Sequence, residues 1–183
     1  MARIILVTGG ARSGKSRYAA SFFDHHQQVV YMATSRIEDE EMQARVQQHQ
    51  QSRPPTWKTF EGTYNLSQAT EGERQTLHYL LDCVSVLTAN IMFDLTRMYE
   101  RIPLELQQKV EDTVVQELAR LIRKITALDG WLVMVTNEVG CSIVPENHVA
   151  RVYRDILGRV NQRLAALCSE VYLVTCGIPL RLK

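Results

Sequence analysis

The sequence predicts one α/β domain, built on a mostly parallel sheet with helices on both faces. Two observations carry this prediction: short apolar runs alternate with longer segments of helical period, and polar residues follow each apolar run. A chain of 183 residues suits one compact domain with a sizeable core. We therefore expect residues 1–183 to form a single domain.

The apolar runs predict five strands, because each is short, rich in branched residues and bounded by polar turns. They cover 2–9, 28–35, 76–83, 130–138 and 170–177. Helical periodicity predicts helices over 15–23, 39–51, 85–99, 104–128 and 145–167. In the last of these, Val152, Ile156, Val160 and Leu164 recur at four-residue steps, and Pro145 suits a first helical turn. Residues 62–75 form the most loop-like stretch.

Charge and cysteine content restrict the function classes. The net charge of +1 is too small to attract nucleic acid or an anionic membrane to the protein as a whole. The four cysteines are scattered without zinc-ligand spacing, which favours reduced thiols. The apolar opening is too short to span a membrane. We expect a cytoplasmic protein without a nucleic-acid partner or stable membrane insertion.

The octapeptide GGARSGKS fits the phosphate-loop pattern G-x-x-x-x-G-K-[ST] and lies between a predicted strand and a predicted helix. Its backbone N–H groups and the following helix N-terminus suit a phosphate group. Lys15 is placed for the β- and γ-phosphates and Ser16 for Mg²⁺. The predicted nucleotide-binding residues here are Gly9, Gly10, Ala11, Arg12, Ser13, Gly14, Lys15 and Ser16. The fold is therefore expected to be of the P-loop NTPase type.

Ligands of such sheets bind at the carboxyl ends of the strands. Asp82 ends the third apolar run and is a candidate second metal ligand, through a coordinated water. Its alternative is a helix N-cap. Glu138, after the fourth run, has a similar position and an equally plausible role as a loop carboxylate. The N-K-x-D guanine motif of switch GTPases is absent from the sequence. The residues alone leave a Mg-nucleotide phosphotransferase or NTPase.

Several further stretches resemble, in order, the bifunctional adenosylcobinamide kinase / adenosylcobinamide-phosphate guanylyltransferase family of cobalamin biosynthesis. They are GGARSGKSRYA, YMATS, DEEMQARVQQHQQSRPPTWKTFE, LLDCVSVLTAN, VTNEVGCSIVPENHVARVYRDILGRVNQRLA and CGIPLRLK. The resemblance implies that a nucleoside triphosphate, ATP or GTP with Mg²⁺, phosphorylates adenosylcobinamide. GTP then transfers GMP to adenosylcobinamide phosphate. It also implies a homotrimer.

The same resemblance assigns His49 as the residue that carries GMP. A neutral imidazole nitrogen can attack the α-phosphorus, and the phosphoramidate formed stays reactive towards a second phosphate. From its local sequence alone, His49 is more typical of a solvated residue on a helix face than of a nucleophile. With Lys15 and Asp82, it completes the predicted catalytic set.

Other family positions that contact GTP match Thr34, Ser35, Arg36, Gln50, Gln51, Ser52, Arg53, Glu61 and Asp82. Glu61 could accept hydrogen bonds from guanine; otherwise it is a turn carboxylate. Arg151, Arg154 and Arg159 either bind substrate phosphate or solvate a helix face. Two alternatives stay open for the whole chain: a small-molecule kinase without guanylyl transfer, and a non-catalytic nucleotide sensor.

Overall fold

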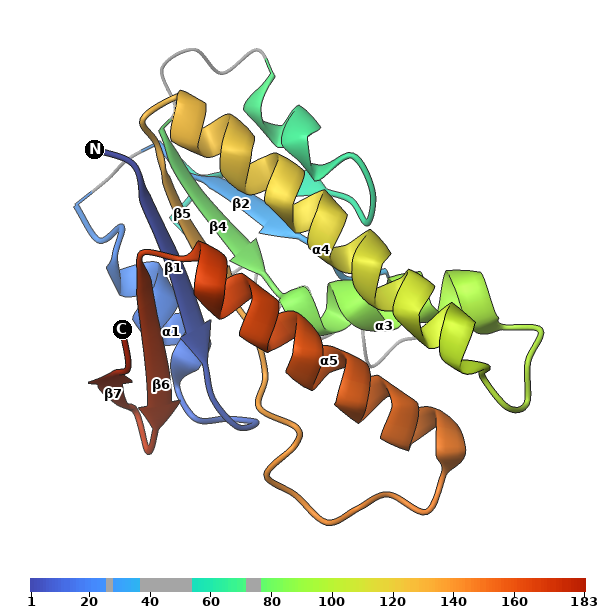
Figure 1. The fold of residues 1–183 in the computed structure, drawn as a ribbon. Coiled ribbons are helices and arrows are strands. Elements are labelled where there is room, and N and C mark those ends of the chain that lie inside the picture. Colours follow the sequence, from blue (N-terminus) through green and yellow to red (C-terminus); the bar gives the residue numbers. More distant parts are fainter. Residues whose placement is uncertain (26–27, 37–53, 72–76) are drawn as a thin grey trace.

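The computed structural model describes residues 1–25, 28–36, 54–71 and 77–183 (Figure 1). Within them, one sheet has the strand order β3-β2-β4-β5-β1-β6-β7. The strands are β1 (Arg3–Thr8), β2 (Val30–Ala33), β3 (Lys58–Glu61), β4 (His78–Asp82), β5 (Trp131–Val135), β6 (Glu170–Thr175) and β7 (Ile178–Arg181). Neighbouring strands are parallel except for β7, which runs antiparallel to β6. The predicted, mostly parallel sheet is confirmed.

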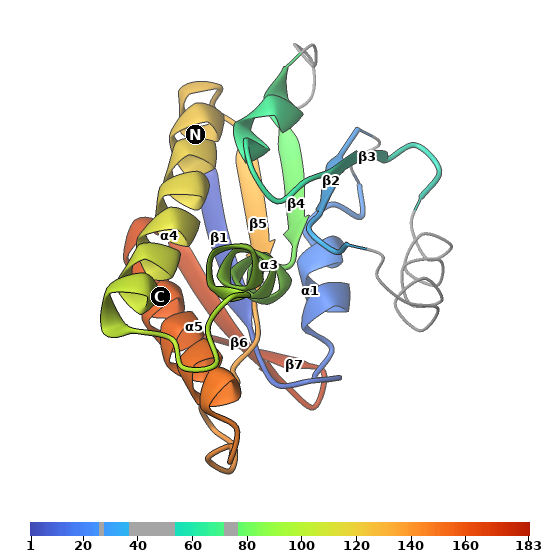
Figure 2. The same ribbon diagram turned by 90° about the vertical axis from the view of Figure 1, so that its right-hand side faces the viewer.

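Helices cover both faces of this sheet, as predicted. They are α1 (Lys15–Ser21), the 3₁₀ helix η1 (Leu66–Thr70), α3 (Val84–Thr96), α4 (Leu104–Ala127) and α5 (His148–Leu167). Figures 1 and 2 show α4 and α5 side by side on one face and α1 on the other. The helix predicted over 39–51 lies outside the described residues.

Two apolar layers hold the helices to the sheet. The larger layer lies under α3, α4 and α5, where Leu87, Leu118 and Ile156 are fully buried. The smaller one lies under α1, centred on Ala19 and Phe23. Fully burying one such large side chain stabilises the fold by about 1.5–3 kcal/mol. Both layers run up to the carboxyl ends of the central strands and hold those ends in place.

The last helix begins later than predicted. It starts at His148, and the Asn147 side chain caps it by accepting a hydrogen bond from the Ala150 N–H at 3.0 Å. The prediction that Pro145 occupies the first turn is therefore wrong. Asn147 is a better N-cap than proline because its side-chain oxygen satisfies a free backbone donor.

Two strands and a short helix are additional to the predicted elements. Residues 62–71, expected to be loop-like, contain η1, and Leu66 of this helix is fully buried. The N–H of Asn65 donates to Glu117 of α4 at 2.9 Å, which fixes the segment to that helix. The two strands, β3 and β7, form the sheet's edges.

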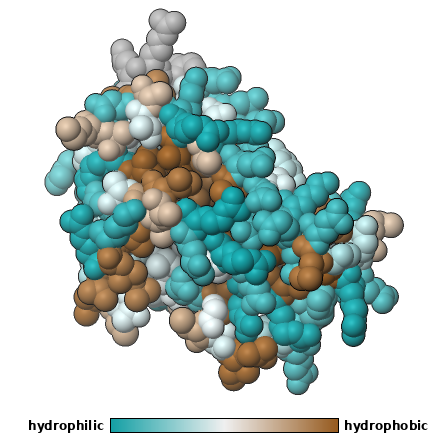
Figure 3. All heavy atoms as spheres, in the orientation of Figure 1, coloured by the Kyte–Doolittle hydropathy of each residue, from teal (hydrophilic) through white to brown (hydrophobic). Residues whose placement is uncertain are grey.

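The face that carries α4 and α5 is mainly hydrophilic. Figure 3 shows much of it teal, with hydrophobic side chains exposed in its upper middle, at its lower left and at its lower edge, the last over the loop that leads into α5. This loop carries Ile143 and Val144, whose exposed fractions are 92% and 60%. In the part of the chain that the structure describes, no helix is both long and apolar enough to cross a membrane.

Candidate active site

The strand order brings the phosphate loop and Asp82 to one edge of the sheet. β5 lies between β1, which precedes the loop, and β4, which ends at Asp82. Val135 is in register with Val7 on one side and with Asp82 on the other. Because neighbouring strands are about 4.8 Å apart, the ends of β1 and β4 are separated by roughly 10 Å. That gap suits a triphosphate bound across the end of β5.

The phosphate loop has a backbone that only small residues allow. Gly14 has a φ of 94°, in the left-handed region that favours glycine. A Cβ at Gly9 would lie 2.5 Å from the Val174 carbonyl oxygen and 2.6 Å from the Ser13 Oγ. The Ser13 Oγ is buried and has no hydrogen-bond partner among the described residues. It is therefore available to a group held in the loop.

The Lys15 ammonium group folds back over its own loop. Its Nζ donates a hydrogen bond to the Gly10 carbonyl at 3.0 Å. Burial lowers the pKa of Lys15, while Coulombic interactions with the side chains of Cys83 and Asp82 act to raise this pKa. These interactions arise because the end of β4 lies close to Lys15. The structure thus brings the predicted pair Lys15 and Asp82 together.

The carboxylate of Asp82 is held by strand β2. Its Oδ2 accepts a hydrogen bond from the Tyr31 hydroxyl at 2.8 Å. Among the described residues, its Oδ1 has no hydrogen-bond partner. The alternative N-cap role is wrong, because Cys83 precedes α3 and caps it without a side-chain bond. The chain turns into α3 one residue too late for Asp82 to reach the free N–H groups.

Thr34 joins the ends of β2 and β4. Its hydroxyl donates to the Cys83 carbonyl at 2.8 Å and accepts from the Cys83 N–H at 3.0 Å. Thr34 is also buried, and its carbonyl accepts from the Asn90 side chain at 2.7 Å. The hydroxyl of Thr34 therefore positions the residue that follows Asp82.

The remaining described candidates lie along the outer part of the same edge. Ser35 is half-buried between Thr34 and Arg36. Arg36 makes a two-pronged ion pair with Asp94 of α3, with both N–O distances 2.7 Å. Glu61 is exposed at the end of β3, in register with Ala33 of β2. Glu61 is therefore a strand-end residue rather than part of a turn.

Glu138 belongs to a polar network between the phosphate loop and α5. Its N–H donates to the Gly9 carbonyl at 3.1 Å, and its Oε1 accepts from the Thr8 hydroxyl at 3.2 Å. The Asn161 amide donates to the same Oε1 at 3.3 Å and to the Asn137 carbonyl at 3.1 Å. Glu138 is thus a loop carboxylate whose side chain these bonds fix beside the phosphate loop.

Sequence reasoning missed Asn161 and Tyr31, whose side chains hold Glu138 and Asp82. Asn161 is buried and accepts a hydrogen bond from the Thr136 hydroxyl at 2.8 Å. The sequence does contain one signal for Asn161. It interrupts the apolar stripe of the helix between Leu157 and Leu164, and a buried amide there must form hydrogen bonds with nearby polar groups. Tyr31 gives no such signal, because tyrosine is an ordinary strand residue.

Five predicted residues lie outside the described residues: His49, Gln50, Gln51, Ser52 and Arg53. Their placement relative to Lys15 stays a prediction.

The residues at this edge are compatible with Mg²⁺. The described part of the chain has no cluster of three or more histidine, cysteine or acidic residues suited to a metal ion. Mg²⁺ bound with nucleotide needs no such cluster, because phosphate oxygens and waters supply most ligands. The open Oδ1 of Asp82 and the Ser16 hydroxyl provide the oxygen donors that this ion prefers.

Comparison with known proteins gives matches along almost the entire chain. A family model described as cobinamide kinase / cobinamide phosphate guanyltransferase matches residues 5–182. The bifunctional adenosylcobalamin biosynthesis protein CobU of Escherichia coli is 43% identical over 98% of this chain and 99% of that protein. CobU of Salmonella typhimurium gives the same figures. The bifunctional adenosylcobalamin biosynthesis protein CobP of Pseudomonas aeruginosa is 31% identical, covering 97% and 96%.

Proposed function

The chain belongs to the cobinamide kinase / cobinamide phosphate guanylyltransferase family, and from this we propose that it carries out two reactions at the phosphate-loop edge of its sheet. A nucleoside triphosphate, ATP or GTP, first phosphorylates adenosylcobinamide. GTP then reacts with adenosylcobinamide phosphate to give adenosylcobinamide-GDP and pyrophosphate. The assembly expected is a homotrimer, working in the cytoplasm.

In the kinase step, the phosphate loop positions the triphosphate and stabilises the charge on the transferred phosphoryl group. The substrate hydroxyl oxygen forms a bond to the γ-phosphorus, the bond to the β-phosphate oxygen breaks, and the nucleoside diphosphate leaves with that electron pair. The hydroxyl proton is released as the new ester forms. Lys15 and the loop N–H groups stabilise the charge on the transferred group. Glu138, fixed against Gly9, holds the loop in its binding conformation.

The guanylyl step uses His49 as a nucleophile. An imidazole nitrogen attacks the α-phosphorus of GTP, and pyrophosphate leaves. A phosphate oxygen of the corrinoid substrate then attacks the same phosphorus, the P–N bond breaks, and neutral His49 is regenerated. Arg36, Glu61 and the segment 50–53 contribute to GTP binding in this proposal.

Mg²⁺ bound by Ser16 and Asp82 would neutralise phosphate charge during both reactions. Ser16 would supply its hydroxyl oxygen and Asp82 a carboxylate oxygen, both beside the phosphate loop. The Tyr31 hydroxyl keeps the Asp82 carboxylate in that orientation.

The proposal is carried by one observation besides the family: Lys15 and Asp82 lie at the same sheet edge, close enough for charge interaction. Its test is the Lys15→Met variant assayed for phosphorylation of cobinamide. We expect kcat/KM to fall at least about 100-fold, because a group that stabilises the transition state is lost. The melting temperature should stay nearly constant, since Lys15 makes only one exposed hydrogen bond within the described chain.

Lys109→Met, at an exposed position on α4, is the matched control and should retain full activity. Undiminished kinase activity in Lys15→Met would contradict the proposed role of the phosphate loop.

A further inference from the structure

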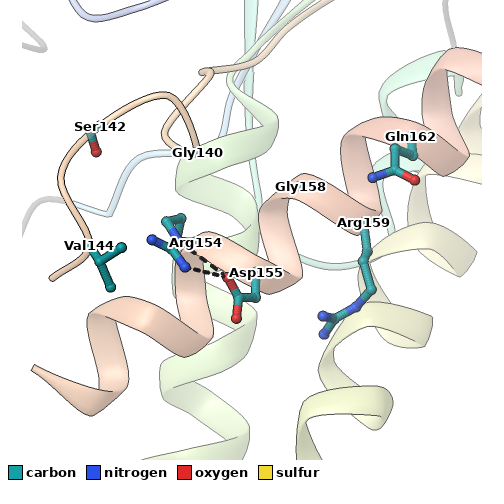
Figure 4. A pocket seen from close by; sticks show the side chains of 8 residues that line it. All are labelled: Gly140, Ser142, Val144, Arg154, Asp155, Gly158, Arg159 and Gln162. Carbon is teal, nitrogen blue, oxygen red and sulfur yellow. Dashed lines mark hydrogen bonds and ion pairs between the residues drawn. The ribbon is translucent and has the colours of Figure 1, made fainter.

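A cavity of about 460 Å³, widely open to solvent, lies between α5 and the loop that precedes it. Figure 4 shows its lining side chains, with Arg154 and Asp155 between the loop and the later turns of α5. The lining residues are Gly140, Ser142, Val144, Arg154, Asp155, Gly158, Arg159 and Gln162. None of the reactions described above uses this cavity.

The charges around the cavity are already paired. Arg154 lies 3.1 Å from the Asp155 carboxylate, and Arg159 lies 2.6 Å from the buried Glu111 of α4. A free phosphate would have to compete with those carboxylates. The cavity therefore favours the uncharged polar groups of a ligand.

Hydrogen-bonding capacity nevertheless remains. The Arg159 side chain bonds Glu111 through Nε, so its two Nη groups are donors without a partner among the described residues. The Asp155 Oδ2 is an unused acceptor, since Arg154 is bonded to Oδ1. The Gln162 amide, also without a described partner, offers both a donor and an acceptor. This combination matches primary carboxamides, whose C=O accepts and whose NH₂ donates.

The position of the cavity suits a substrate that must reach the phosphate loop. Gly140 lines the cavity and is two residues from Glu138, a span of at most about 7 Å. The Glu138 N–H is itself bonded to the Gly9 carbonyl of the loop. A bulky ligand seated in the cavity can thus extend a short arm to the phosphate loop. Val144 lines the cavity, and with the neighbouring, exposed Ile143 it offers an apolar surface for the ligand's ring face.

We propose that this cavity binds the carboxamide-bearing edge of the corrin ring of the cobinamide substrate, with the aminopropanol arm directed to the phosphate loop. The inference rests on the proposed function. The corrin ring is larger than the cavity, so one edge with its amide side chains enters while a ring face lies against Ile143 and Val144.

The sharpest test is Gly158→Leu. A Cβ at Gly158 meets nothing within 4 Å and Gly158 lines the cavity, so we expect a leucine there to fill part of the cavity. Leucine also favours the helix more than glycine does, which protects folding. In kinase assays we expect the KM for cobinamide to rise at least about tenfold, because the cavity is filled and amide hydrogen bonds are lost. The KM for ATP should be unchanged.

Two further variants complete the experiment. Gln162→Leu removes the unused amide without filling the cavity and should raise the KM for cobinamide by a few-fold. Ala166→Leu, at an exposed position of the same helix outside the cavity, is the matched control and should change neither KM.

The outcomes separate the two proposals. If the wild-type protein does not phosphorylate cobinamide at all, the proposed function fails. If the wild type is active and Gly158→Leu retains its KM for cobinamide, the corrin-ring inference is overturned while the function stands.

Discussion

Arg36 is a predicted GTP contact whose surroundings the structure defines closely. Its guanidinium forms the ion pair with Asp94 described above, and its Nε donates to the Thr63 hydroxyl at 3.2 Å. Tyr64 donates to the same carboxylate at 2.9 Å. Burial, together with the hydrogen bond to Asp94, raises the pKa of Tyr64 to about 12, so its hydroxyl stays a donor at neutral pH. Arg36 is thus held in one orientation before any nucleotide binds.

This arrangement predicts a pH-dependent contribution to stability. The hydrogen bond from Arg36 holds the pKa of Asp94 below its ordinary value of 3.8. The stabilisation is therefore complete at pH values above 3.8 and is lost as the pH falls through the lowered folded-state pKa. Asp94→Asn should reduce the free energy of unfolding by about 1 kcal/mol at neutral pH, a small amount because the pair is partly exposed.

Urea unfolding of both proteins across this pH range measures the effect. The difference between them should shrink as the pH falls below 3.8. A difference that stays constant down to the acid limit would show that the charge of Asp94 is not what stabilises the wild type.

The sequence predicted site residues well where a local pattern marks them and poorly where partners come from distant segments. Lys15 and Ser16 follow from an eight-residue motif, and Asp82 from its place after an apolar run. The bond from Tyr31 to Asp82 joins residues 51 positions apart, and no local pattern contains that pairing. The ion pair of Arg36 with Asp94 could not be predicted either, because its two residues are 58 positions apart in the sequence.

At the scale of elements, the β6–β7 turn supports the phosphate loop. The Gly177 N–H donates to the Ser13 carbonyl at 2.8 Å, and a Cβ at Gly14 would lie 3.1 Å from the Gly177 Cα. Cys176 and Gly177 have φ values of 51° and 78°, the positive angles typical of a two-residue type I′ hairpin. The hairpin therefore packs its tightest point against the nucleotide site.

Substitution of Gly177 should damage both stability and nucleotide binding. Gly177→Val places a branched side chain at a φ of 78°, which costs about 1–2 kcal/mol of unfolding free energy. Its Cβ would lie 3.4 Å from the Arg17 side chain, and the strained turn would disturb the Gly177 N–H that donates to the Ser13 carbonyl, so we expect the KM for ATP to rise several-fold. Thermal unfolding and kinase kinetics measure the two effects.

Cys176→Asn is the control in the same turn. Asparagine tolerates positive φ better than cysteine, so this variant should be as stable as the wild type or slightly more stable, with unchanged KM. Equal KM values for Gly177→Val and the wild type would show that the hairpin does not support the loop.

The strands that the sequence predicted are those with a buried, continuous apolar run, namely β1, β2, β4, β5 and β6. The missed strands are short edge strands. All four residues of β7 are exposed and one is Pro179, so neither burial nor alternation marks the segment. In β3, only Phe60 is partly buried. Edge strands are defined by the neighbour that they pair with: β3 pairs with β2, which is far away in the sequence, and β7 pairs with β6 across a two-residue turn that no Asn-Gly or Asp-Gly pair marks.

At the scale of the whole molecule, one sheet shared by two apolar layers predicts a single cooperative unfolding transition. Both tryptophans, Trp57 and Trp131, pack on the α1 side of the sheet. The longest helices, α4 and α5, lie on the opposite side. Tryptophan fluorescence and far-ultraviolet circular dichroism therefore report different faces.

We expect the two signals to give the same urea midpoint, since strands β1, β4 and β5 contribute to both layers. Two separated midpoints would mean that the faces unfold independently and that residues 1–183 are not one domain.

In the proposed function, one site of the molecule performs both phosphoryl transfer and guanylyl transfer, with His49 carrying GMP. The most direct measurement incubates the protein and Mg²⁺ with GTP labelled at the α-phosphate, then denatures it and counts the bound label. We expect a label that is stable to base, labile to acid and absent from His49→Ala. Binding of GTP without any covalent label would contradict the guanylyl-transfer mechanism and leave a kinase or a nucleotide sensor.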